Sequence, residues 1–383
     1  MKPIYLDYMA TTPLDPLVKE SMLEFLGGIE EDLFGNTNSL HYYGRKAKEA
    51  IENARIKVAN LVSCSPHSIL WTSGATEANN LAIKGAADFY RRQGNHIITS
   101  TIEHSSVLAC CRHLETQGFE VSYVQPSPDG LVEPHILEKE IRRETILISL
   151  MHANNEIGTI QDIAKIGAIA KDRGILLHVD AAQSLGKIAI DLVNLPVDLM
   201  SFSAHKIYGP KGAGALYIRS NPRLHLTPQI HGGPQESNLR AGTLATHQIV
   251  GMGEACYIAG QRIQEDGSHQ RYLLNLLSEA ATNWGNITIN GSTKYRLPNN
   301  LNISIGGIDH KPLIDALEDI AISATAACHD TQPSHVLKAI GVTDRLINNS
   351  LRISIGRFTT EEEINYVIAY LGRIINQLQE ITR

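Results

Sequence analysis

Short apolar runs alternate with longer helical patterns through the middle of the chain. One helical pattern, at 162–174, has apolar residues at helical spacing and ends at a glycine. Strands that alternate with helices in this way predict an α/β fold with a mostly parallel sheet. We predict five of its β-strands at 96–100, 145–151, 175–180, 199–203 and 214–219.

The pattern changes after about Gly260. Residues 297–305 predict a strand and residues 311–319 predict a helix. In the C-terminal tail, Thr360 and Glu363 have the spacing of a capping box, and apolar residues then follow at helical intervals. We therefore expect a large domain over 15–258 and a smaller α/β domain formed by 1–14 and 259–383.

Composition and charge argue against several classes of protein. Of the 383 residues, 43% are hydrophobic and 19% are charged, as in ordinary globular proteins, and the formal net charge is −6. Since no basic run stands out, we expect no nucleic-acid binding. The five cysteines form no C-x-x-C pair, which argues against zinc ribbons and predicts a reducing compartment. No run of 18 apolar residues occurs, so we expect a cytoplasmic protein without a membrane segment.

Chemically useful polar residues follow four of the predicted strands. In open α/β sheets, ligands bind beyond the carboxyl ends of the strands. Any one such residue could be ordinary turn chemistry, but four strands that end this way indicate a binding site. The residues are His104 after 96–100, Asn155 after 145–151, Asp180 and Gln183 after 175–180, and Ser203, His205 and Lys206 after 199–203.

A further segment suits an anionic group. Ser73, Gly74, Ala75 and Thr76 follow a strand-like end at 69–71 and open a predicted helix. Small residues at a helix N-terminus leave backbone N–H groups free for a phosphate, although alone the segment could be a plain helix start. A phosphate cradle, an acid at a strand end and a lysine on a turn together suit pyridoxal 5'-phosphate, because a lysine amine condenses with its aldehyde.

Four motifs resemble a known family. They are HVDAAQ (178–183), SFSAHKIYGPKG (201–212), TSGATEANN (72–80) and TIEHSSV (101–107). They are similar to the cysteine desulfurases of the NifS/IscS type, in the class V branch of fold-type I pyridoxal-phosphate enzymes. The likeness covers nearly the whole chain. It implies a large domain with a mostly parallel seven-stranded sheet, a smaller α/β C-terminal domain and a homodimer.

The resemblance also implies roles for the candidate cofactor residues. Lys206 would be the Schiff-base lysine, and Asp180 would face the pyridine nitrogen. His104 would stack on the ring and act in catalysis, and Gln183 would reach the phenolic oxygen. The phosphate would be held by Ala75, Thr76, Ser203 and His205, and by Thr243 of the second subunit.

Substrate binding and sulfur transfer are implied in the same way. Asn155, which also contacts the cofactor, and Arg352 match positions that hold the substrate carboxylate, which the planar guanidinium can bind bidentately. Cys328 matches a cysteine whose thiolate attacks the substrate sulfur, leaving L-alanine and an enzyme persulfide. The stretch from Cys328 to Pro333 is shorter than in housekeeping relatives, which shortens the reach of this loop.

We therefore expect a cysteine desulfurase that passes sulfur from L-cysteine to an acceptor protein for iron–sulfur cluster assembly or tRNA thiolation. One alternative is a selenocysteine lyase, whose branch Cys328-His329 resembles. Another is a class V aminotransferase, which needs Lys206 but no mobile cysteine. A scaffold paralogue without activity predicts loss of Lys206 or Asp180, and both are present. We expect no metal site.

Overall fold

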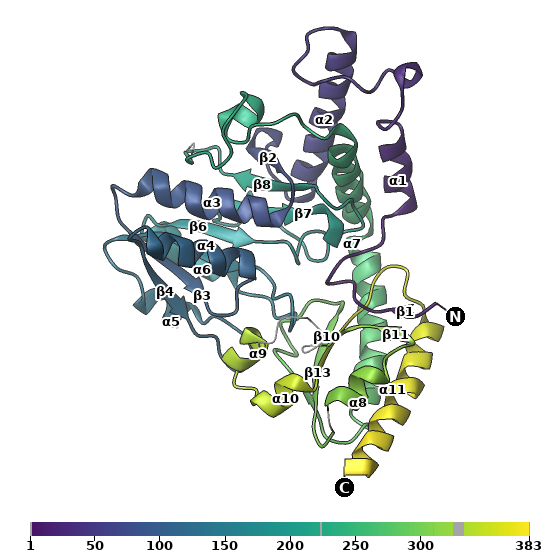
Figure 1. Ribbon diagram of the computed structural model, residues 1–383. Coiled ribbons are helices and arrows are strands. Elements are labelled where there is room, and N and C mark those ends of the chain that lie inside the picture. The colour runs from purple at the N-terminus through teal and green to yellow at the C-terminus, as the bar shows by residue number, and fades with distance from the viewer. Residues whose placement is uncertain (1, 223, 309, 325–332, 383) are drawn as a thin grey trace.

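The computed structural model describes residues 2–222, 224–308, 310–324 and 333–382. Its central element is a seven-stranded sheet with the order β2-β8-β7-β6-β5-β3-β4 (Figure 1). Neighbouring strands are parallel, except that β8 is antiparallel to β2 and to β7. The predicted mostly parallel sheet is thus confirmed. The strands are β2 (Ile69–Thr72), β3 (His96–Ser100), β4 (Glu120–Val124), β5 (Thr145–Met151), β6 (Leu176–Asp180), β7 (Leu199–Ser203) and β8 (Gly214–Ile218).

Helices cover both faces of this sheet. Successive strand residues point to opposite faces, so Leu147 enters one apolar core and Ile148 the other. The face of Leu147 is covered by α3 (Ala75–Tyr90) and α4 (Ser105–Thr116). The opposite face is covered by α2 (Tyr42–Leu61), α5 (Pro134–Lys139), α6 (Ile163–Asp172) and the first part of α7 (Thr246–Ala281).

The C-terminal part of the chain forms a second sheet, with the order β12-β13-β10-β9, and β1 pairs with β11 beside it. The predicted capping box is confirmed, because Thr360 N donates to Glu363 Oε2 and Glu363 N donates to Thr360 Oγ1. The elements are β1 (Ile4–Tyr5), β9 (Ile287–Ile289), β10 (Asn300–Ile305), β11 (Ile320–Ala321), β12 (Ser323–Ala324), β13 (Ser350–Ser354), α8 (His310–Asp315), α9 (His335–Ala339), α10 (Asp344–Asn348) and α11 (Glu361–Thr382).

The 36-residue helix α7 connects the two sheets (Figure 1). Its first half, with Met252 and Cys256, packs in the core of the large sheet. Its second half, with Leu273 and Leu277, packs in the core of the small sheet. The boundary predicted at 258/259 falls inside this helix, and the division into domains stays a prediction.

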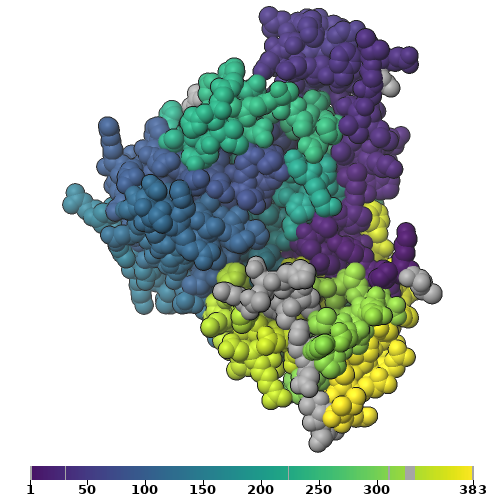
Figure 2. Space-filling model, in the orientation of Figure 1, coloured from purple at the N-terminus to yellow at the C-terminus, as the bar shows by residue number. Residues whose placement is uncertain are grey.

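The N-terminal segment also connects the two sheets. Asp7 forms a bridge with Ser354 at the end of β13, and Thr12 N donates to the carbonyl oxygen of His205 at 3.0 Å. The chain then enters α1 (Pro16–Leu23), which with α2 and the connection between them forms the arm that projects at the top of Figure 2. Short 3-10 helices are also present among the described residues: η1 (Ile29–Glu31), η2 (Pro66–Ser68), η3 (Ala204–Lys206) and η4 (Gln235–Asn238).

None of the helices in the described ranges has the length and apolar character that a membrane crossing requires.

Candidate functional site

A cavity of about 1620 Å³ lies at the carboxyl ends of the central parallel strands. Strand direction explains its position, because parallel strands bring their carboxyl ends to one edge of the sheet. The cavity is also lined by the N-terminal segment and by residues of the C-terminal sheet. Ten of the residues to which a site role is assigned from the sequence line it: Ala75, Thr76, His104, Asn155, Asp180, Gln183, Ser203, His205, Lys206 and Arg352.

Lys206 lies in the turn that follows β7. The chain leaves this strand through η3, and Tyr208 adopts a positive φ of 65° that reverses its direction. The Nζ atom of Lys206 donates to the carbonyl oxygens of Met9 at 2.6 Å and Ala10 at 2.7 Å. Burial, followed by the charge of Arg352, lowers the pKa of Lys206 to about 8. An appreciable share of this amine is therefore unprotonated and nucleophilic near neutral pH.

Asp180, the last residue of β6, is buried in the cavity wall. Its Oδ1 atom accepts from Ala182 N at 2.9 Å, and its Oδ2 atom accepts from Asn79 Nδ2 at 2.8 Å. A carboxylate held in this way keeps a fixed orientation toward a cationic group in the cavity. Asn79 was not predicted from the sequence, and its signal there is a polar residue on the otherwise apolar face of α3.

His104 is the N-cap of α4 and is connected to Asp180 through two residues. Its Nδ1 atom accepts from the backbone N–H of Ser106 at 3.2 Å and lies 2.8 Å from the Ser106 hydroxyl, which in turn accepts from Asn79. Because Nδ1 is the acceptor, the hydrogen of the neutral ring is on Nε2. Burial lowers the pKa of His104, which favours this neutral form.

Behind His104, Glu103 is fully buried. Its Oε1 atom accepts from Met151 N at 3.0 Å, and its Oε2 atom has no partner among the described residues. Burial raises the pKa of this carboxyl well above its ordinary value, which favours the protonated, uncharged form of Glu103. The carbonyl oxygen of Glu103 accepts from His335 Nε2 at 3.0 Å, which attaches the start of α9 to the cavity.

The segment predicted to cradle an anion begins α3, as the sequence predicted for the helix start. Gly74 precedes the helix with a φ of 155°. A Cβ atom on Gly214 would lie 2.4 Å from Gly74 Cα, so the close approach of β8 to this segment requires a glycine at position 214. The first N–H groups of a helix have no partner within it, and those of Ala75 and Thr76 are thus available to an anion.

His205 lies beside this cradle as a neutral ring. Burial, followed by the charges of three lysines, lowers the pKa of His205 to about 4. Its Nδ1 atom lies 3.2 Å from Thr11 Oγ1, which fixes the orientation of the ring. A neutral, oriented imidazole can donate a hydrogen bond to a phosphate oxygen.

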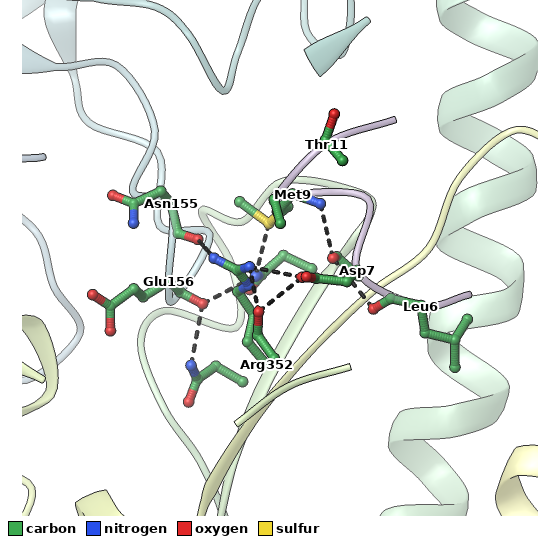
Figure 3. A network of polar contacts seen from close by, with 12 residues as sticks. Leu6, Asp7, Met9, Thr11, Asn155, Glu156 and Arg352 are labelled. Atoms are coloured by element: carbon green, nitrogen blue, oxygen red, sulfur yellow. Dashed lines mark hydrogen bonds and ion pairs between the residues drawn. The ribbon is translucent and has the colours of Figure 1, made fainter. Parts of the chain in front are cut away.

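Arg352 is on β13 and lines the cavity, and Figure 3 shows its side chain between Asp7 and Asn155. Its Nη1 atom donates to the carbonyl oxygen of Asn155 at 2.8 Å, and its Nη2 atom donates at 2.7 Å to Asp7 Oδ1 and to Ser323 Oγ. The buried Nε atom of Arg352 and the buried Oδ1 atom of Asn155 have no partners among the described residues. The loop after β5, the N-terminal segment and β12 thus hold the guanidinium in place through its Nη1 and Nη2 atoms.

Several further contacts could not be predicted from the sequence. Ser334 Oγ donates to Glu156 Oε2 at 2.5 Å, and Asn300 Nδ2 donates to the carbonyl oxygen of Glu156. These contacts hold the loop after β5 against the C-terminal part of the chain. They join residues that are far apart in the sequence, which no local pattern reveals.

Among the described residues, one predicted site residue does not line the cavity. Thr243 is exposed and lies outside its wall. Cys328 lies outside the described residues. The roles assigned to both residues stay predictions.

The model of the aminotransferase class-V family matches residues 4–367. The cysteine desulfurase IscS of Stutzerimonas stutzeri (strain A1501) is 52% identical, over 99% of this chain and 94% of that protein. The protein of the same name from Azotobacter vinelandii is 51% identical over the same shares.

Solved structures of similar proteins have the same fold as this chain. A structure titled "NIFS-LIKE PROTEIN" superposes with a TM-score of 0.91 at 38% identity, covering 98% of this chain and all of that one. Another, "SspA in complex with cysteine", has a TM-score of 0.83 at 38% identity, over 93% of this chain and all of that chain. The chain therefore belongs to the aminotransferase class-V family of pyridoxal-phosphate enzymes and, within it, to the cysteine desulfurases of the NifS/IscS type.

Proposed function

We propose that the protein is a cysteine desulfurase, which uses pyridoxal 5'-phosphate to convert L-cysteine to L-alanine and a persulfide on Cys328. The observation that carries this proposal is the arrangement of Lys206, Asp180 and the N-terminus of α3 around one cavity. A buried amine with a pKa of about 8, a buried carboxylate and a cradle of free N–H groups match the aldehyde, the pyridine nitrogen and the phosphate of this cofactor.

The residues present fit the cofactor. Asp180 would face the pyridine nitrogen, and Ala75, Thr76, Ser203 and His205 would hold the phosphate. His104 would stack on the ring and Gln183 would reach the phenolic oxygen. When bound, the cofactor accepts amines at its aldehyde and withdraws electrons from the α-carbon of the substrate.

Arg352 and Asn155 would hold the α-carboxylate of L-cysteine. Both residues line the cavity, and a guanidinium and a side-chain amide are donors that suit a carboxylate. With the carboxylate held there, the amino group would lie in the same cavity as Lys206. Lys206 in its free-amine form would remove the proton from Cα, and the Nε2–H group of His104 can donate a proton along the reaction.

Sulfur transfer would follow by attack of the Cys328 thiolate on the substrate sulfur. The Cβ–S bond breaks, its electron pair stays with the carbon fragment, and that fragment takes up a proton and leaves as L-alanine. The sulfur remains on Cys328 as a persulfide. An iron–sulfur scaffold or another sulfur-carrier protein would then accept it, and the shortened stretch before Pro333 favours an acceptor that approaches closely.

A homodimer is part of this proposal. Large apolar side chains on the projecting arm are exposed, including Leu17 at 58%, Ile29 at 72% and Leu40 at 89%, and a patch of this kind marks a protein–protein contact. Thr243 of one copy would reach the phosphate of the other, consistent with its exposure here. The unpaired cysteines of the described residues support a cytoplasmic location, where thiols stay reduced.

The test is to measure alanine and sulfide formed from L-cysteine in the presence of a reductant, with L-selenocysteine in parallel. Wild type should release both products from L-cysteine, and Cys328→Ser should retain the cofactor but lose that activity. Turnover of selenocysteine alone would favour a selenocysteine lyase. Full activity of Cys328→Ser on cysteine would replace the proposal with another class V reaction.

A further inference from the structure

Lys187 is a partly buried lysine to which the reaction above gives no role. It follows β6 in the turn that carries Gln183, and its Nζ atom donates to Gln183 Oε1 at 3.0 Å. Within the part of the chain that the structure describes, no carboxylate oxygen lies within 4 Å of this amine. The hydrogen bond to Gln183 is thus the contact through which Lys187 can act, since removing a cation even partly from water without an opposite charge is costly.

The surroundings exclude a ligand site at Lys187. The cavity it lines has a volume of about 10 Å³, which is space for about one water molecule. The titratable groups that face this space are Tyr8, Lys206, Tyr208, Asp266 and Arg357. Asp266 is already bound to Arg357 at 2.8 Å, so it does not neutralise Lys187. Burial and the charges of Lys206 and Arg352 lower the pKa of Lys187 to about 7.

The contacts of Gln183 determine how its amide is oriented. Its Nε2 atom donates to the carbonyl oxygen of Met9 at 3.0 Å, and a carbonyl oxygen can only accept. The Oε1 atom therefore faces Lys187, whose amine donates in either protonation state. Met9 also accepts from Lys206 at 2.6 Å, so both of its lone pairs are used. The second hydrogen of Gln183 Nε2 is therefore available to a ligand, because Gln183 lines the catalytic cavity.

We propose that Lys187 is a positioning residue: by holding Oε1 of Gln183, it keeps the remaining Nε2 hydrogen turned toward the phenolic oxygen of the cofactor. This inference rests on the proposed function, in which Gln183 contacts that oxygen. Without Lys187, the buried Oε1 atom loses its donor, and the amide turns to find another. The phenolic oxygen then loses a hydrogen bond that favours its ionised form.

The experiment is a spectrophotometric pH titration of the bound cofactor in the holoenzyme. Lys187→Met should raise the midpoint of the visible absorbance change by about one pH unit, the scale of a hydrogen bond to a charged group. Lys187→Arg keeps a hydrogen-bond donor, so its midpoint should lie closer to that of wild type than the midpoint of Lys187→Met does. An unchanged midpoint in Lys187→Met would overturn the inference.

A double-mutant cycle separates positioning from a direct effect of charge. If Lys187 acts through Gln183, then adding Lys187→Met to Gln183→Leu should leave the midpoint of Gln183→Leu unchanged. If the two shifts add, Lys187 acts on the cofactor through its charge, and the positioning role is wrong. Lys171→Met, which changes an exposed lysine of α6, is the matched control and should titrate like wild type.

Two further measurements keep the outcome clear. Urea unfolding checks that Lys187→Met is folded, and Lys187→Ala replaces it if it is not. A wild type that lacks the visible band or forms no alanine from L-cysteine would overturn the proposed function and this inference together. A wild type with both properties, but with a midpoint that Lys187→Met does not change, would overturn this inference alone.

Discussion

The Nη2 atom of Arg352 lies 2.7 Å from Oδ1 of Asp7, and the two residues are 345 positions apart in the chain. The last strand of the small sheet and the segment after the first strand thus meet at one end of the catalytic cavity (Figure 3). Asp7 fixes the orientation of the guanidinium, although it accepts from only one of its nitrogen atoms, Nη2. The buried Nε atom stays without a partner among the described residues.

Arg352→Met should therefore weaken substrate binding more than it slows the chemical step. Loss of a charge-assisted hydrogen bond costs about 2 kcal/mol, so kcat/KM for L-cysteine should fall about 30-fold, mainly through a higher KM. Steady-state kinetics of alanine formation measures this effect. Arg345→Met, at an exposed arginine of α10, is the control and should behave like wild type. An unchanged KM in Arg352→Met would remove Arg352 from the substrate site.

Loading of the cofactor should depend on the protonation of Lys206. Because the pKa of Lys206 is lowered to about 8, the free amine becomes the major form above pH 8. The rate at which the apoenzyme gains visible absorbance with pyridoxal phosphate should rise about tenfold per pH unit below pH 8 and level off above it. A stopped-flow series from pH 6 to about pH 10 measures this rate.

The same series in Arg352→Met provides an internal check. The charge of Arg352 lowers the pKa of Lys206, so its removal should move the midpoint to higher pH. A wild-type rate that keeps rising up to the ordinary pKa of lysine would show that Lys206 is not perturbed.

Glu103→Gln should make the protein more stable above neutral pH. The folded protein holds a proton on Glu103 at pH values where the unfolded chain has lost it, because burial raises the pKa of this carboxyl. The free energy of unfolding of wild type therefore falls as the pH rises above about 4.5, up to the raised pKa of Glu103. Glutamine has no proton to lose and can still accept from Met151 N.

Urea unfolding of wild type and Glu103→Gln at pH 5 and at pH 8 measures this difference. The variant should gain stability relative to wild type between the two pH values. An equal difference at both pH values would mean that Glu103 is ionised in the folded protein.

Arg357 should be important for stability. Its side chain is 7% exposed, and its guanidinium lies 2.7 Å from Asp15 and 2.8 Å from Asp266. Arg357→Met would leave these buried carboxylates without their main partner, which costs about 3–5 kcal/mol. Chemical denaturation at neutral pH measures this loss. Arg173→Met, which breaks a pair between half-exposed side chains, should cost less than about 1 kcal/mol.

The sequence predicts the part of the fold that depends on local pattern. The strands predicted at 96–100, 145–151 and 199–203 match β3, β5 and β7 at both ends, because a buried strand is a short apolar run between turn residues. The polar residues at the carboxyl ends of β3, β6 and β7 could be predicted to meet, since parallel strands bring these ends to one edge of the sheet. This accounts for His104, Asp180 and Lys206 in one cavity.

The rest of the site depends on contacts that no local pattern contains. One of the carbonyl oxygens that Lys206 contacts belongs to Met9, 197 residues away, and the side-chain amide that holds Asp180 belongs to Asn79, 101 residues away. A backbone carbonyl has no sequence signature at all. Asp7 and Ser323 likewise become partners of Arg352 only through the pairing of the C-terminal sheet with the N-terminal segment.

The path of residues 4–12 has a consequence for biosynthesis. These residues leave the ribosome well before β11 and β13, although both strands are among their partners. Most of the large sheet can form while the chain is still being made, because its strands are contiguous in sequence. The wall around Met9 and Asp7 must wait for the C-terminal strands. A nascent chain truncated before β13 would therefore contain Lys206 and Asp180 but lack a finished substrate site.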